Sequence, residues 1–112
     1  MKKIVILVAA LLASNPANAE KSEEDIIDSL CTLVGSRAAS VFYDRLLGVD
    51  IFAARKAVDT DFVELPEVKG IMNEIVMDTY GQILRIGTEA QLAQAKDFKA
   101  KWAYRCFQRY GD

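Results

Sequence analysis

The chain has 112 residues, a formal net charge of −2 and no histidine. This length fits one domain, and the acidic balance argues against nonspecific binding of nucleic acid or anionic membranes, which requires clustered lysine and arginine. Without histidine the chain lacks the commonest general base, the commonest metal ligand and any Ser-His-Asp or Cys-His catalytic set. We therefore expect no metal and no cofactor.

The pattern of residues 1–19 predicts a secretory signal peptide. They combine lysines at 2–3, an apolar run at 4–13 and an Ala-Asn-Ala cleavage site at 17–19. The alternative is a membrane anchor, but this run is too short to cross ~30 Å of hydrocarbon as a helix. We expect cleavage to leave a single helical domain, residues 20–112, that is periplasmic or secreted and not stably inserted in a membrane.

The first helix of that domain is predicted to start at Ser22 and to run to about Leu47. Ser22 can cap it, and the three acidic residues that follow suit the positive end of a helix dipole. Apolar residues then recur at helical spacing, and Gly48 is a natural stop. Gly35 lies inside this helix beside small neighbours, which predicts the close approach of another helix.

Two shorter helices are predicted next. Asp50 can cap a helix over 51–58, which the polar residues at 59–61 would end. Pro66 suits the first turn of a third helix, because its missing N–H costs nothing there. Gly81 is expected to end that helix.

A linker over 82–87 is predicted to lead into the last helix. Residues 88–91, Thr-Glu-Ala-Gln, fit the capping-box pattern. The fold class is therefore all-α, a small bundle of four to five helices whose long first and last members pack antiparallel. The apolar stripe of the last helix is expected to comprise Ala95, Phe98, Trp102, Cys106 and Tyr110.

Cys31 and Cys106 are the only cysteines, and they fall on the apolar faces of the first and last helices. An even pair in an exported protein is typical of a disulfide. A zinc site would need further ligands, and the spacing does not match a CxxC redox motif. A bridge over so long a loop is worth roughly 4 kcal/mol on the chain-entropy model.

Paired carboxylates are the remaining candidates for catalysis. Asp59 and Asp61 are two residues apart, and Asp44 and Asp50 bracket a turn. A glycosidase holds two such groups across a substrate cleft, for which a small helical domain has little room. We interpret Asp59 and Asp61 as loop and cap residues and expect no enzyme.

Exposed apolar side chains are the strongest remaining signal. Residues 46–52 place five large apolar side chains around one turn, and residues 83–86 repeat the pattern in the later linker. One interpretation is that both turns fill the ends of the core. The other is a dimer or partner surface. Its candidate residues are Leu47, Val49 and Phe52, with Tyr43 and Arg45 nearby, and with Ile83, Leu84 and Ile86 as the second choice.

Charge is uneven along the domain. Residues 20–28 are acidic and residues 96–109 carry five basic side chains, Lys96, Lys99, Lys101, Arg105 and Arg109. Both segments are typical of solvated helix ends, and a footprint for a partner is the alternative.

Short motifs across much of the domain carry a family resemblance. They are Cys31-x3-Gly35-x-Arg37-Ala38-Ala39, Arg45-x2-Gly48-Val49, Ile75-Val76-x2-Thr79-Tyr80 and Phe98-x3-Trp102-x3-Cys106. The chain thereby resembles a family of short, signal-bearing, two-cysteine helical proteins of proteobacteria and their phages, to which no activity is assigned. The resemblance implies export and a disulfide, and it adds no catalytic residue. In architecture alone the chain is also similar to the HdeA-type periplasmic acid-stress chaperones.

The function we expect is non-enzymatic binding of another protein in the periplasm, of the inhibitor, immunity or exclusion kind. An acid-stress chaperone is the alternative, and a small hydrolase is a third. A homodimer is compatible with the first reading, and the partner is not identified by the sequence.

Overall fold

The computed structural model describes residues 22–111 of the chain. These residues form four α-helices and the connections between them. They are α2 (Glu23–Leu46), α3 (Ile51–Asp61), α4 (Pro66–Gly81) and α5 (Thr88–Tyr110). The predicted all-α class is confirmed, and the helix count within these residues is the lower of the two expected. The predicted signal peptide lies outside the described residues.

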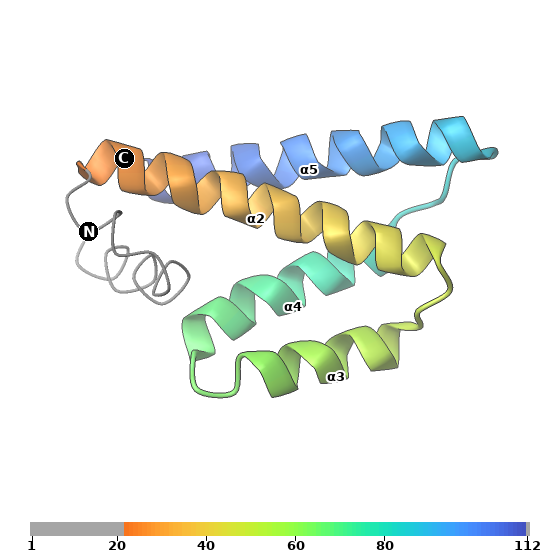
Figure 1. Cartoon of the computed structure of the whole chain (residues 1–112), viewed down its shortest axis with the longest axis horizontal. Coiled ribbons are helices and arrows are strands. Elements are labelled where there is room, and N and C mark those ends of the chain that lie inside the picture. The colour runs from red at the N-terminus through yellow and green to blue at the C-terminus, as the bar shows by residue number, and fades with distance from the viewer. Residues whose placement is uncertain (1–21, 112) are drawn as a thin grey trace.

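The long helices α2 and α5 lie side by side and run in opposite directions, as Figure 1 shows. Helix α4 packs across α2, and α3 packs on α4 at the outside of the bundle. The α2–α3 and α4–α5 connections therefore lie at one end of the molecule. The α3–α4 loop and the two outer termini of α2 and α5 lie toward the other end (Figure 1).

Two features fix α2 against α5. Cys31 and Cys106 form a disulfide with a Cα–Cα distance of 5.3 Å, as predicted. Gly35 lies so close to α5 that an added Cβ would be 3.0 Å from the Lys99 carbonyl oxygen and 3.2 Å from the Ala103 Cβ. The expectation that small residues in this helix permit close approach is confirmed.

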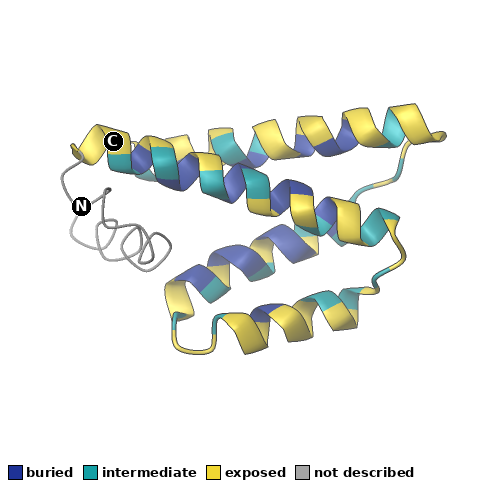
Figure 2. Cartoon of the chain, in the orientation of Figure 1, coloured by how far each residue is buried: buried dark blue, intermediate teal, exposed yellow. Residues whose placement is uncertain are grey.

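The core lies where α2, α4 and α5 meet, and Figure 2 shows their buried residues on the inward faces. The Phe42 and Phe98 ring centroids are 5.3 Å apart, so the C-terminal part of α2 packs against the middle of α5. Val58 is the only buried residue of helix α3, so this helix covers the bundle rather than forming its centre. The buried apolar residues of the other helices include Leu30, Val34, Ala38, Ile71, Met72, Ile75, Val76, Ala95 and Trp102.

Most predicted helix ends are confirmed. The Ser22 hydroxyl accepts a hydrogen bond from the Asp25 backbone N–H at 3.2 Å, and the Asp50 carboxylate accepts from the Ala53 N–H at 2.8 Å. Pro66 is the first residue of α4. Gly48 has φ +96°, a backbone conformation that glycine adopts without the steric cost a Cβ would add.

Two predicted ends are wrong. Helix α3 continues past residue 58 to Asp61, and an ion pair of 3.4 Å between Asp59 and Lys69 of α4 accompanies the extra turn. The capping box at Thr88 does not form, because Gly87 is the N-cap and no side chain caps the helix. The Gln91 side chain instead donates to the Arg85 carbonyl oxygen at 3.1 Å.

Tyr110, predicted on the apolar stripe of the last helix, packs against the core. It is only partly buried because it is the final residue of α5, where the bundle ends.

Candidate functional site

The most exposed of the large apolar side chains in the described residues gather at one end of the bundle. Ile86, Ile83, Leu47 and Phe52 are 97, 91, 83 and 79% exposed, and no other large apolar side chain in residues 22–111 exceeds 68%. Leu47 and Phe52 flank the α2–α3 connection, and Ile83 and Ile86 lie in the α4–α5 connection. We call these four residues the apolar end; both connections are at the right of Figure 1.

Arg45 and Tyr80 tie the two connections together. The Arg45 guanidinium donates to the carbonyl oxygens of Thr79 and Gln82, at 2.6 and 2.8 Å, where α4 ends. It also lies over the Tyr80 ring, 5.6 Å from the centroid. The Tyr80 hydroxyl donates to the Val49 carbonyl oxygen. A positive side chain that satisfies the last carbonyls of a helix is a favourable cap, so these contacts hold the two turns in a fixed relation.

The buried side chain of Gln94 holds the α4–α5 connection from beneath. Its carbonyl oxygen accepts from the Arg85 backbone N–H, and its amide donates to the Ile83 carbonyl oxygen, both at 2.9 Å. Leu84, between these two residues, packs against the core. With the backbone held in this way and Leu84 turned inward, the Ile83 and Ile86 side chains are left in solvent.

The predicted interface residues divide into two groups. Leu47, Phe52 and Tyr43 are exposed, whereas Val49 and Arg45 are partly buried, and the Arg45 guanidinium is engaged within the molecule. Both interpretations of these turns therefore hold for part of their side chains. Leu46, Ile51 and Leu84 pack against the core, whereas others remain exposed.

Gln94 was not singled out from the sequence, although a signal for it exists. It lies four residues before Phe98, on the apolar stripe of α5, and it is a polar residue at a buried position. A buried amide needs hydrogen-bond partners. Its position therefore indicates backbone groups nearby that lack partners of their own.

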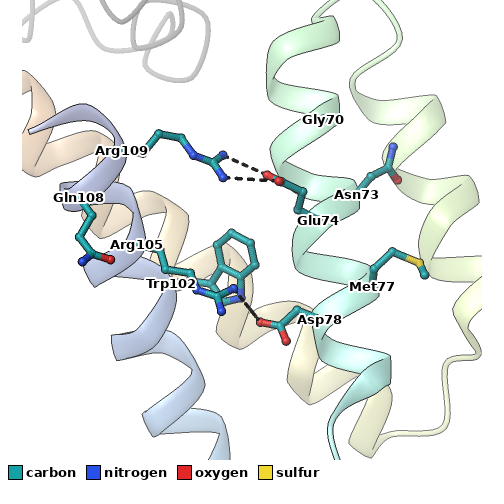
Figure 3. A pocket seen from close by; sticks show the side chains of 9 residues that line it. All are labelled: Gly70, Asn73, Glu74, Met77, Asp78, Trp102, Arg105, Gln108 and Arg109. Atoms are coloured by element: carbon teal, nitrogen blue, oxygen red, sulfur yellow. Dashed lines mark hydrogen bonds and ion pairs between the residues drawn. The ribbon is translucent and has the colours of Figure 1, made fainter.

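A groove of about 830 Å³ runs between α4 and α5 (Figure 3). Asp78 is its main polar centre: the Trp102 indole N–H donates to Asp78 Oδ2 at 2.9 Å, and Lys101 Nζ lies 2.8 Å from the same oxygen. Glu74 and Arg109 form a second bridge, with Nη1 and Oε2 3.0 Å apart. The charges that line this groove are largely paired with one another and join α4 to α5.

The pKa of Asp78 lies below its usual value. Partial burial acts to raise it, but hydrogen bonds from Lys101, Gln82 and Trp102 and the charge of Lys101 together outweigh that effect. Asp78 therefore stays ionised at more acidic pH than an ordinary carboxyl group, and the α4–α5 contact depends on that charge.

The other residues considered for chemistry lie apart from this groove. Asp59 and Asp61 are in the last turn of α3, whereas Asp44 is in the last turn of α2 and Asp50 is the N-cap of α3. Within residues 22–111 no group of three or more Asp, Glu, Cys or His side chains is placed to hold a metal ion. No helix among these residues has the length and hydrophobicity needed to span a membrane.

Comparisons of this chain with protein-family models, with curated proteins and with solved structures give no match.

Proposed function

We propose that this protein is exported and binds another protein through the apolar end, acting without catalysis as an inhibitor, immunity or exclusion protein. The observation that carries the proposal is the gathering of Leu47, Phe52, Ile83 and Ile86 at one end of the bundle. Large exposed apolar side chains that gather on one part of a small protein mark interaction sites. Export is supported by residues 1–19 of the sequence and by the disulfide, since such bonds persist in oxidising compartments.

The energetics favour recognition by this surface. Removing a large apolar side chain from water contributes about 1.5–3 kcal/mol, and four such side chains are available at the apolar end. Binding also costs the ordering of loops and side chains. The hydrogen bonds of Arg45, Tyr80 and Gln94 already order both connections, so less of that cost remains to be met on binding.

The test compares two substitutions at exposed apolar positions. Phe52→Asp changes the apolar end, whereas Val63→Asp changes the α3–α4 loop at the other end of the bundle, where Val63 is 68% exposed. Periplasmic extract is passed over the oxidised wild-type protein and over each variant, and retained proteins are compared by mass spectrometry. A partner retained by wild type and Val63→Asp, and lost with Phe52→Asp, supports the proposal. A partner retained equally by all three contradicts it.

An acid-activated chaperone is a second candidate, and the state of Asp78 favours it. Because its pKa in the folded protein is lowered, this carboxylate contributes stability that is present above the usual carboxyl pKa and is lost as pH falls through the lowered value. Acid would thus loosen the α4–α5 contact. The test is the near-UV circular dichroism of Trp102 at about pH 2.5, below ordinary carboxyl pKa values. Loss of this signal, together with suppressed aggregation of unrelated proteins, supports a chaperone. An unchanged signal contradicts it.

A further inference from the structure

Charged side chains of opposite sign lie on the two sides of Phe52 in the chain. Asp44 in the last turn of α2 and Asp50 at the N-cap of α3 precede it, and Arg55 and Lys56 follow it by three and four residues in α3. Residues at these helical spacings lie on the same face as Phe52. All four charged side chains are exposed, and none forms an ion pair with another described residue.

This order of charges is self-complementary. In a two-fold symmetric interface the same surface occurs on both subunits, so residue i of one copy meets residue j of the other, and j meets i. A two-fold axis that passes near Phe52 brings the acidic side of one copy, Asp44 and Asp50, against the basic side of the other, Arg55 and Lys56. A different partner whose surface carried charge of a single sign would instead meet like charges either at Asp44 and Asp50 or at Arg55 and Lys56.

The available area supplies a large share of a dimer interface. By the usual scaling of apolar burial with area, each side chain of the apolar end offers roughly 60–120 Å², so the four together offer about a third to three fifths of the ~800 Å² that one side of a standard interface buries. Tyr43, exposed in the last turn of α2, adds to it. The apolar end lies away from the disulfide-linked ends of α2 and α5, so two bundles can meet end to end without clashing along their lengths.

We infer that a second copy of this chain covers the apolar end, with Phe52 near the two-fold axis and with Asp44 and Asp50 facing Arg55 and Lys56 of the other copy. This inference rests on the proposed function in taking the apolar end as the binding surface. It adds a form of regulation: self-association and partner binding use the same side chains, so the dimer must open before a partner binds.

Sedimentation equilibrium of the oxidised, exported protein tests the inference. The mass of the wild type is expected to move from one chain to two as concentration rises through the micromolar range. Phe52→Asp is expected to raise the dimer dissociation constant roughly 30-fold or more, the effect of losing a central aromatic contact. Val63→Asp should leave it unchanged. If Phe52→Asp fails to fold by circular dichroism, Ile83→Asp, at 91% exposure, replaces it.

Charge reversal tests the two-fold arrangement itself. Asp44→Lys and Lys56→Glu should each weaken self-association, and an equimolar mixture of the two should associate again, because opposite charges then meet across the axis. A wild type that stays a single chain into the millimolar range overturns the inference, as does equal weakening by Val63→Asp or a mixture that does not recover.

The two proposals can fail separately. A monomeric wild type that still loses its captured partner on Phe52→Asp contradicts the dimer and leaves the proposed function. A dimer broken by Phe52→Asp, with no retained protein sensitive to that change, contradicts the proposed function and leaves the dimer.

Discussion

The Cys31–Cys106 disulfide is expected to supply a large part of the stability of this domain. The two cysteines are 75 residues apart in sequence. On the chain-entropy model, a loop of that length stabilises the folded state by about 4.5 kcal/mol, because it restricts the unfolded chain. Small domains have total stabilities of roughly 5–15 kcal/mol. Reduction should therefore remove from about a third to nearly all of this stability.

Urea unfolding of one protein preparation, with and without a thiol reductant, measures this effect. Trp102 is buried between α4 and α5, so its fluorescence reports the loss of tertiary structure. Comparing oxidised and reduced wild type avoids replacing two buried sulfur atoms, which would add a packing cost of its own. The slope of the transition should also steepen on reduction, since the reduced unfolded chain exposes more surface.

The result that would refute this reasoning is a small change. If reduction lowers the free energy of unfolding by less than about 1 kcal/mol, loop closure is not what stabilises the domain. The packing of α2 against α5 around Gly35 would then be sufficient by itself.

Three further predictions concern single side chains. Gly35→Ala should lower the melting temperature, because the new Cβ would lie 3.0 Å from a backbone oxygen of α5; the matched Gly70→Ala in α4, which meets no atom within 4 Å, should raise stability by up to about 1 kcal/mol. Gln94→Leu should cost about 1–3 kcal/mol in urea unfolding by leaving two backbone groups without partners, whereas Gln91→Leu, at an exposed hydrogen bond, should cost less; equal losses would contradict the role of Gln94. Asp78→Asn should make the melting temperature fall less steeply toward acid pH. The lowered pKa of Asp78 means that its carboxylate stabilises the fold above the ordinary carboxyl pKa and that this stabilisation is lost as pH falls through the lowered value. The same decline of melting temperature in acid for wild type and variant would count against this.

Local sequence patterns predicted the helices well where a single residue type decides the geometry. Ser22, Asp50, Pro66 and Gly48 each mark a helix end in the structure as expected. The pairing of α2 with α5 was also predictable, because two cysteines and Gly35 fall on apolar stripes that must be buried.

The errors arose where contacts outside a helix compete with the residue pattern at its end. The Thr88 capping box does not form: Gly87 is the N-cap of α5, and the Gln91 side chain donates to the Arg85 carbonyl oxygen of the preceding connection. Helix α3 extends past its polar residues, and Asp59 meets Lys69 of another helix there. Neither contact can be inferred from spacing along the chain.

The apolar end was predictable in part. Both connections were recognised as rich in apolar residues, but no periodic pattern says which side chains of an irregular loop point inward. In the structure, Gln94 and Arg45 bind backbone carbonyls of the connections and leave Ile83 and Ile86 outside, while Leu84 is partly buried against the core. The two connections lie at the same end because helices joined by short connections alternate in direction along the chain.

Site-specific photo-crosslinking in living cells tests most directly whether the apolar end binds protein. A photoreactive phenylalanine derivative is placed at Phe52, at Ile83 or, as the control, at Val63, all of which are exposed. Adducts of higher mass, containing a partner or a second copy of the chain, are expected from positions 52 and 83 and not from 63. Adducts from 63 alone, or none from 52 and 83, would contradict the account.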